Sequence, residues 1–362
     1  MAPMIVDRIT TFEQLDTLRA RWNDLYVQDS QANFFLSWEW MRACLATQRK
    51  PWMVLGAREP NGPYAALLPL RIERFPSIGP AVNRELALAG NPRADYTGML
   101  GLAGAQAQFL PALAREIGDL RWDNFTLKDY ADDRIAALIA LFERDGFRVA
   151  VAERTPSPYV ELPATWEEYV SSRSYATRRT IRNKLRRIES LPGYRLHYAA
   201  PDEAGAAIEA LLRINSRRWK KSLSKRRATF GELFARCYAS GCCIVSTMSS
   251  GESVIAAQSS FLDARTRTVI GYMMGYDAAY AKFSPGAMIV CAAIRYAIEQ
   301  GFAHFELSRG GESFKSSLAT GVAYTAHATL TRPGVRVAAV NVGRRGFFAA
   351  KGLARQLLVR PA

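Results

Sequence analysis

The order in which helical and strand-like segments follow one another is the feature that most limits the fold of this chain. Helices, a run of strands, a further helix and more strands occur in this order twice, before and after the stretch Glu153–Pro158. That stretch is a predicted linker, because its two prolines extend neither a helix nor a central strand. The sequence therefore predicts two α/β domains with mixed sheets, over residues 1–154 and 155–331, followed by a basic amphipathic tail over residues 332–362.

No segment of the sequence is long and apolar enough to cross a bilayer. The longest apolar run, Gly286–Ile294, has nine residues, whereas a spanning helix needs about 20. The first residues also lack the basic and apolar regions of a signal peptide. We therefore expect a cytoplasmic protein.

Cysteine and histidine usage argues against several kinds of site. The five cysteines are odd in number and form no C-x-x-C pair, so we predict buried, inert thiols and neither zinc nor disulfides. The three histidines each fall in a strand-like segment, where packing is their usual role. We expect no metal site and no histidine-dependent hydrolase.

Positive charge is concentrated in three segments that contain no acidic residue. The net charge of +15 favours an anionic partner such as nucleic acid, anionic lipid or a phosphorylated ligand. On the long basic helix predicted over Thr165–Ser190, Arg178, Arg182 and Arg186 share one face. Like charges at this spacing destabilise an isolated helix, so the face predicts an anionic ligand; a solvated surface helix is the alternative of equal weight.

The best-defined helix is predicted over Pro285–Gln300. Ser284 is its expected N-cap, Pro285 its first residue and Gly301 its C-terminal glycine. Because a strand leads directly into it, the free amides and the positive dipole end would form an anion site beside a sheet. Gly286, which has no side chain, would let a phosphate approach the backbone. A plain crossover helix is the alternative.

Familiar catalytic motifs are missing from the sequence. Gly310–Ser316 resembles a phosphate loop, but Phe314 stands where a glycine must precede the lysine. The chain also lacks a nucleophile elbow, a dinucleotide fingerprint and the H-E-x-x-H pattern.

An ordered set of residues between Trp166 and Thr331 nevertheless resembles a known family. The set comprises Tyr276, Asp277, Tyr280, Ser284-Pro285-Gly286, Gly301, Phe305-Glu306-Leu307, Arg309-Gly310 and Phe314-Lys315, with the basic run Arg178–Arg187 and the pair Arg218-Trp219. Together they resemble the CelD/BcsL-type branch of the GNAT acyltransferases, which is close to the FemAB peptidyltransferases. The resemblance implies two tandem GNAT-like domains, the first degenerate and the second catalytic.

The resemblance also implies an acyl-CoA-type donor and suggests where it binds. It places the pyrophosphate of the thioester at Ser284, Pro285 and Gly286, with Tyr280 and Lys282 beside them. Two departures leave the donor open between acetyl-CoA, a longer acyl-CoA, an acyl carrier protein and an aminoacyl-tRNA. Lys282–Gly286 stands where typical members have Q/R-x-x-G-x-G/A, and Glu306 stands where an aspartate is usual.

The chemistry of acyl transfer suggests roles for the remaining residues. Asp277 or Glu306 would act as base, and Tyr276 or Tyr280 would protonate the leaving group. Lys315 would stabilise the oxyanion or hold a substrate phosphate, and we expect it to serve transfer and not folding. Packing is the equal alternative for both tyrosines, and capping of the next loop is the alternative for Asp277.

The substrate side of the expected site is basic. Arg309 would clamp a carboxylate or phosphate with both of its terminal nitrogens. The other candidates for substrate binding are Arg178, Arg182, Arg186 and Trp219.

We therefore expect an acyltransferase that moves an acyl group, most simply acetyl, to an amine or hydroxyl of a phosphate-bearing or lipid-linked precursor of an envelope component or exopolysaccharide. One alternative is FemAB-like transfer from aminoacyl-tRNA, for which the basic helices are suited. Another is a non-catalytic module that binds nucleic acid or anionic membrane. The amphipathic stretch Gly346–Val359 predicts contact with anionic lipid, with packing on its own domain as the alternative.

Overall fold

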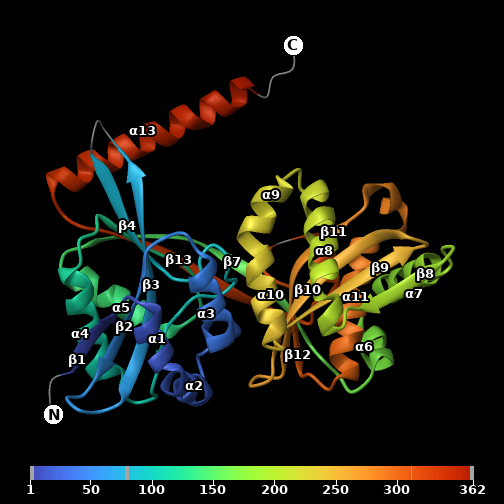
Figure 1. Ribbon diagram of the computed structural model, residues 1–362, viewed down its shortest axis with the longest axis horizontal. Coiled ribbons are helices and arrows are strands. Elements are labelled where there is room, and N and C mark those ends of the chain that lie inside the picture. The colour runs from blue at the N-terminus through green and yellow to red at the C-terminus, as the bar shows by residue number, and fades with distance from the viewer. Residues whose placement is uncertain (1–3, 78–80, 311, 359–362) are drawn as a thin grey trace. The chain divides into compact units, whose positions relative to one another are not determined.

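The computed structural model describes residues 4–77, 81–310 and 312–358, with the backbone alone described at residue 345 and over residues 348–358. The chain forms two compact units, and the strands within each unit have both parallel and antiparallel neighbours (Figure 1). Unit 1 comprises Met1–Met41, Arg49–Arg154 and Thr325–Ala362, and unit 2 comprises Arg42–Gln48 and Thr155–Tyr324.

Unit 1 is a sheet in the order β1-β2-β3-β4-β6-β13, in which β4 and β6 are parallel and the other neighbours are antiparallel. Helices α4 and α5 pack side by side, and their apolar faces share one core with the sheet. The elements of unit 1 are β1 (Ile5–Ile9), α1 (Phe12–Thr17), α2 (Arg19–Gln28), η1 (Phe34–Leu36), α3 (Trp38–Thr47), β2 (Trp52–Arg58), β3 (Tyr64–Pro76), β4 (Val82–Leu88), β5 (Leu100–Gly101), α4 (Gln106–Asp119), β6 (Asn124–Tyr130), α5 (Asp133–Arg144) and α13 (Val335–Leu358).

Unit 2 is a sheet in the order β7-β12-β11-β10-β9-β8, in which β11 and β12 are parallel. The unit boundaries fall inside α3, β7 (Arg148–Glu161) and β13 (Gly321–Thr331), so that α3 contributes residues to both units. The other elements of unit 2 are α6 (Trp166–Ser172), α7 (Tyr175–Glu189), β8 (Tyr194–Tyr198), η2 (Pro201–Glu203), α8 (Ala204–Arg218), α9 (Leu223–Arg226), η3 (Arg227–Gly231), α10 (Glu232–Ala239), β9 (Cys243–Ser250), β10 (Ser253–Asp263), β11 (Thr268–Tyr276), η4 (Ala278–Phe283), α11 (Pro285–Glu299), β12 (His304–Glu306) and α12 (Ser313–Leu318).

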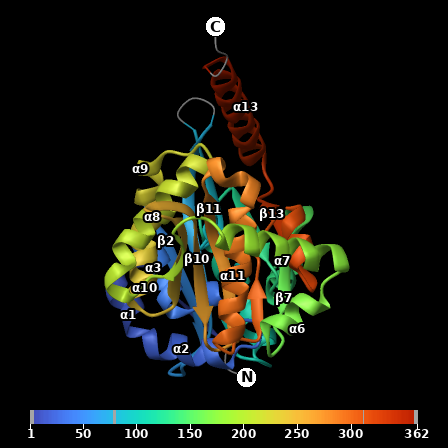
Figure 2. The ribbon, with the colours of Figure 1, turned by 90° about the vertical axis from the view of Figure 1, so that its right-hand side faces the viewer.

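Helices cover both faces of the sheet in unit 2. Figure 2 shows α8 and α10 on one side of β10, and α7 and α11 on the other. Gly275 of β11 lies on the face of the sheet that α8 covers, and its two neighbours in the strand point to the opposite face. A β-carbon at Gly275 would come within 2.6 Å of the Asn215 amide nitrogen, so this glycine allows the backbones of β11 and α8 to meet.

Helix α11 follows the sequence prediction closely. Residues Met288–Ile294 are all buried, because neighbouring elements cover the helix on several sides. Gly301 has a φ of +73°, and the amide of Phe302 donates to the Ala297 carbonyl at 2.9 Å. This is the geometry in which glycine ends a helix.

The predicted linker at Glu153–Pro158 is wrong, because these residues lie inside strand β7. Proline lacks an amide donor but keeps its carbonyl acceptor. The carbonyl of Pro158 accepts from the Leu307 amide at 3.0 Å, and that of Pro156 accepts from the Gly310 amide at 3.2 Å. Strand β7 continues through both prolines because their carbonyl groups accept hydrogen bonds from backbone amides of the neighbouring segment.

The single basic helix predicted over Thr165–Ser190 is two helices. Helix α6 ends at Ser172, and Ser174 caps α7 by accepting from the Thr177 amide at 3.2 Å. Serine in extended backbone favours this capping bond over continuation of a helix.

The C-terminal strand and helix pack on unit 1. The sequence predicts residues 325–331 in the second domain, but they belong to unit 1, where β13 pairs with β6 over Ala326–Thr331. In α13, Arg344 forms an ion pair with Glu85, and Ser77 donates to the Val340 carbonyl at 2.6 Å. Of the predicted lipid-binding side chains, Phe347 is 39% exposed, whereas Phe348, Lys351, Leu353, Arg355, Leu357, Leu358 and Val359 lie outside the described side chains.

In the part of the chain that the structure describes, no helix combines the length and apolar character needed to cross a membrane.

Candidate functional site

The start of α11 differs from its predicted geometry. Ser284 occupies the N-cap position but has left-handed backbone (φ +56°, ψ +46°), and its side chain makes no capping bond. Its carbonyl accepts from the amides of Ala287 and Met288 at 3.0 and 3.1 Å. Pro285 is the first residue and has no amide hydrogen. The anion site expected here is therefore limited to the Gly286 amide and the positive end of the helix dipole.

The sequence predicts that Gly286 is open to an approaching phosphate. The structure shows instead that this glycine is packed against other residues. It is buried, and a β-carbon at this position would lie 2.8 Å from Cδ1 of Tyr276 and 3.3 Å from the Met274 sulfur. The glycine therefore lets the Tyr276 ring pack on the helix start. A valine here would collide with that ring, so Gly286→Val should lower the stability of the protein.

Arg218, at the end of α8, brings a further cation to the same place. Its guanidinium carbon lies 4.7 Å from the centre of the Tyr276 ring and 5.2 Å from that of Trp219. Lys282, which is exposed, lies over the ring of Phe283 at 5.2 Å. We call Arg218, Tyr276, Lys282 and Gly286 the helix-start cluster.

The other donor-site candidates lie in the short helix η4 that precedes α11. Tyr280 contacts Phe283, with ring centres 6.4 Å apart. The carboxylate of Asp277 accepts from the Ala279 amide at 2.9 Å, so the structure shows Asp277 in the capping role.

Helix α7 approaches this region through a residue outside the predicted set. Arg187 lies over the Phe283 ring at 5.7 Å, on the side of α7 that meets η4 and α11. The predicted arginines serve other contacts. Arg178 donates to the carbonyls of Ser171 and Arg173 at 2.8 and 3.2 Å, and Arg186 donates to Asn183 at 2.6 Å, while Arg182 is exposed.

A second group of polar residues lies at the middle of β11. Ser308 has left-handed backbone (φ +60°), and its hydroxyl donates to the Gly271 carbonyl. Glu306 of β12 is opposite Ile270. Gln258 of β10 is buried, and its Nε2 atom lies 3.0 Å from the β-carbon position of Gly271. We call Gln258, Glu306, Ser308 and Lys315 the strand-centre cluster.

Lys315 is a buried residue with structural contacts, contrary to the expectation of a purely catalytic lysine. Only 11% of its side chain is exposed. Its ammonium group donates to the Arg309 carbonyl at 2.8 Å and forms an ion pair with Glu312 at 3.0 Å. It therefore holds the turn that carries Ser308 and Arg309, where burial without partners would be costly.

The four predicted catalytic residues are not brought together. Tyr276 and Asp277 lie at the end of β11, whereas Glu306 and Lys315 belong to the strand-centre cluster. At ~3.3 Å per residue, the stretch of β11 between the two clusters spans about 20 Å.

Between the two clusters, one edge of β11 is open in the sense that no strand of the described chain pairs with it there. Strand β12 pairs with β11 only as far as Ile270, while β11 continues to Tyr276 with β10 on its other side. Tyr272 is an extra residue in this pairing, since Ser259 and Ser260 are opposite Met273 and Gly271. Bulges of this kind re-aim side chains and end pairing next to active sites.

Sequence reasoning missed Gln258, Ser308 and Asn215. Buried oxygens of Gln258 and Asn215 have no hydrogen-bond partner in the described structure. The signal for Gln258 was present, because the run Gln258-Ser259-Ser260 interrupts an otherwise apolar strand. Ser308 and Asn215 gave no such signal.

The thiols take no part in either cluster. All five cysteines are free, and burial raises the pKa of Cys291, inside α11, to about 12. Among residues 4–77, 81–310 and 312–358, no three His, Cys, Asp or Glu side chains are placed to hold a metal ion.

Comparison with known proteins identifies the domain that contains both clusters. A family model described as "Acetyltransferase (GNAT) domain" matches residues 176–316. No curated protein matches the chain by sequence.

Solved structures extend the likeness to the whole fold. FemX has a TM-score of 0.57 at 9% identity, covering 89% of this chain and 96% of its own. L-PGS from Bacillus licheniformis has a TM-score of 0.54 at 12% identity, covering 90% and 96%. A tandem GNAT protein from the clavulanic acid biosynthesis pathway has a TM-score of 0.53 at 12% identity, covering 91% and 100%.

These findings confirm the predicted fold class, a mixed α/β architecture of tandem GNAT-like units. The chain is an acyltransferase, and its residues 176–316 are similar to the acetyltransferase (GNAT) domain.

Proposed function

We propose that the chain transfers an acyl group from a CoA-type thioester to an amine or hydroxyl of a phosphate-bearing precursor of an envelope component or exopolysaccharide. The observation that carries the proposal is the open edge of β11 between the helix-start and strand-centre clusters. An acyl-CoA is an extended molecule with phosphates at one end and a thioester at the other. It matches a site that has cations at one end and buried polar groups at the other.

The helix-start cluster would hold the phosphates. The Gly286 amide, the dipole of α11, Lys282 and Arg218 all supply positive potential at one point. Tyr276 and Tyr280 would position the donor from this end. Between the clusters, backbone groups of β11 would pair with an extended ligand as a neighbouring strand does, apart from the carbonyls of Gly271 and Met274, which accept from Ser308 and Asn215.

Chemistry would take place at the strand-centre cluster. The bound donor supplies an activated acyl carbon; the acceptor nitrogen or oxygen attacks it and releases a thiolate. Glu306 would accept the proton of the acceptor, and Lys315 would keep Ser308 and Arg309 in place. Arg309 would bind the phosphate of the acceptor.

The resemblance to the FemAB peptidyltransferases implies one alternative donor, aminoacyl-tRNA, and the fold likeness to FemX is in keeping with it. The exposed Arg182 on α7 supports it, because exposed cations supply most of the affinity for nucleic acid. The CelD/BcsL-type resemblance favours a thioester donor. The separation of the helix-start cluster from the strand-centre cluster along β11 also favours it, because an acyl-CoA is extended. A cytoplasmic enzyme whose C-terminal helix touches anionic lipid would fit a lipid-linked acceptor.

Calorimetric titration of acetyl-CoA into the full chain tests the donor. Arg218→Gln and Lys282→Ala should each weaken binding about tenfold, because each removes a charge-assisted contact. Arg295→Gln is the matched control: this exposed arginine is at the opposite end of α11. Parental affinity in both cluster variants, or an equal loss in the control, would show that the donor binds elsewhere.

Transfer assays then test the acceptor. Acetylation of glucosamine phosphate should exceed that of free glucosamine, and Arg309→Gln should remove the difference. If acetyl-CoA fails to bind while aminoacyl-tRNA binds, the alternative donor is the correct one.

A further inference from the structure

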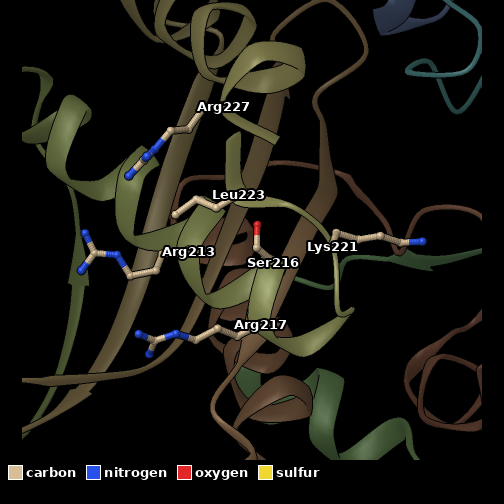
Figure 3. Close-up of a pocket in the computed structure, with 6 residues that line it drawn as sticks. All are labelled: Arg213, Ser216, Arg217, Lys221, Leu223 and Arg227. Atoms are coloured by element: carbon tan, nitrogen blue, oxygen red, sulfur yellow. The ribbon is translucent and has the colours of Figure 1, made fainter. Parts of the chain in front are cut away.

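A cavity of about 430 Å³ lies in unit 2 between the end of α8 and the segment formed by α9 and η3 (Figure 3). It is large enough for a small ligand, since ligand pockets usually measure about 300–1,000 Å³. The residues that line it are Arg213, Ser216, Arg217, Lys221, Leu223 and Arg227.

Three arginines direct their guanidinium groups to the same side of this cavity, while the ammonium of Lys221 points away from them (Figure 3). Arg213 and Arg227 are fixed by one acidic residue, Glu209. Its carboxylate accepts from Arg227 Nε at 2.8 Å and from Arg213 at 3.3 Å. The side chain of Arg217 makes no ion pair or hydrogen bond with any residue that the structure describes. The three arginines and the single carboxylate of Glu209 give the site a net positive charge. The guanidinium of Arg217 is therefore available to bind an anion.

Ser216 provides an independent sign of a ligand. It is 5% exposed, it lines the cavity, and its hydroxyl has no hydrogen-bond partner in the described structure. Buried hydroxyl groups are nearly always satisfied, so an unsatisfied one calls for an explanation. A ligand oxygen in the cavity would satisfy it.

The backbone around the cavity is also unusual. Lys220 follows the C-cap residue of α8, Trp219, and has left-handed backbone (φ +48°), which glycine normally adopts at this position. Arg227 begins η3, a π-helical segment. Short π-helical segments are frequent at functional sites. The left-handed Lys220 and the π-helical η3 together set the course of the backbone that carries the arginines at the rim of the cavity.

The cavity is separate from the helix-start cluster. Arg213 and Arg217 are one turn apart on one flank of α8, whereas Arg218 is rotated by about 100° from Arg217 toward Tyr276. The two anion-attracting places therefore lie on different flanks of the same helix.

We propose that this cavity is a second anion site, which binds the phosphate group of a small phosphorylated ligand or of a lipid headgroup. Arg217 and the Ser216 hydroxyl bind the phosphate oxygens directly. Arg213 and Arg227, held in place by Glu209, complete the positive rim. The inference goes beyond the proposed transfer reaction and does not depend on the identity of the acyl donor.

Calorimetric titration of inorganic pyrophosphate into the full chain tests the site. Arg217→Gln should weaken binding at least tenfold, because it removes an uncommitted charged donor. Ser216→Ala should weaken binding severalfold without lowering the melting temperature, since the hydroxyl makes no bond in the protein itself. Arg236→Gln is the matched control, an arginine of α10 in the same unit whose side chain is 50% exposed.

Lys282→Ala separates this site from the donor site. Retained pyrophosphate affinity in Lys282→Ala, together with its loss in Arg217→Gln, supports the proposal whether or not acyl transfer is found. Loss in Lys282→Ala with parental affinity in Arg217→Gln overturns it. An equal loss in Arg217→Gln and Arg236→Gln also overturns it, because general charge would then explain the binding.

Vesicle sedimentation identifies the source of the phosphate. Phosphatidylcholine vesicles with and without phosphatidic acid are compared for the parent and for Arg217→Gln. Arg217-dependent binding to the acidic vesicles assigns the site to a lipid headgroup, and pyrophosphate binding alone assigns it to a soluble phosphate. Binding of neither probe overturns the proposal.

Discussion

The ring of Tyr276 packs directly against Gly286, so that a β-carbon at Gly286 would lie 2.8 Å from Tyr276 Cδ1. This contact joins the end of β11 to the start of α11. It predicts that Gly286→Ala lowers the free energy of unfolding by about 1–2 kcal/mol, because the ring must move.

A double-mutant cycle isolates that contact. In a Tyr276→Ala background, Gly286→Ala should instead stabilise by about 0.5–1 kcal/mol, the ordinary helix preference for alanine over glycine. Chemical denaturation of the four proteins measures the coupling. The same effect of Gly286→Ala in both backgrounds would show that the ring does not restrict this position.

Ser284 is predicted to be less favourable than glycine at its own position. Its left-handed backbone is strained for any residue with a β-carbon, and its side chain offers no capping bond in return. Ser284→Gly should therefore stabilise the protein by roughly 0.5–1 kcal/mol, and Ser284→Ala should be nearly neutral. A loss of about 1 kcal/mol in Ser284→Ala would instead mean that the serine caps α11.

Lys315 is predicted to matter for stability. Lys315→Ala removes an ammonium group that bonds to the Arg309 carbonyl and pairs with Glu312, and it should cost about 2–3 kcal/mol. Lys282→Ala is the matched control, because Lys282 is exposed, and it should change stability by less than about 0.5 kcal/mol. Equal melting temperatures for the two variants would contradict the buried role of Lys315.

The thiols are predicted to react slowly in the folded protein. Burial raises the pKa of Cys243 and Cys291, and the hydrogen bond with Cys242, together with burial, raises that of Cys237. Because the thiolate is the reactive form, iodoacetamide at pH 8 should label these three residues only after unfolding. Mass spectrometry of native and denatured samples measures this. Rapid native labelling with loss of activity would reopen a covalent mechanism.

Asp7 predicts a pH dependence of unit 1. Arg58 donates to its carboxylate at 2.6 Å and Tyr64 at 2.8 Å, and the Arg58 hydrogen bond lowers the pKa of Asp7 in the folded state. A lowered pKa contributes stability above the unfolded value of about 3.9, and this is lost as pH falls through the folded value. Asp7→Asn should therefore lower the melting temperature at pH 7 and converge with the parent below pH 3. A constant difference across this range would exclude the ion pair as the cause.

Local sequence determined much of the fold. Pro285 and Gly301 set the ends of α11, and the apolar run between them required a helix covered on several sides, as the structure shows. Predicting these features needs only neighbouring residues, because caps and periodicity act within a few positions. The α/β class and the basic character of α7 and α8 were accessible for the same reason.

The tertiary structure decided what lies far apart in sequence. The left-handed Ser284, the Tyr276 ring on Gly286 and the buried Lys315 all depend on partners that no local pattern names. The same is true of Arg218, which reaches Tyr276 only because Gly275 lets α8 approach β11. Local preferences are worth about 1 kcal/mol or less per residue, so packing between distant elements overrides them where the two conflict. The sequence thus specified the helices and strands and their basic side chains. Packing between distant elements decided which of these side chains belong to the helix-start cluster and the strand-centre cluster along β11.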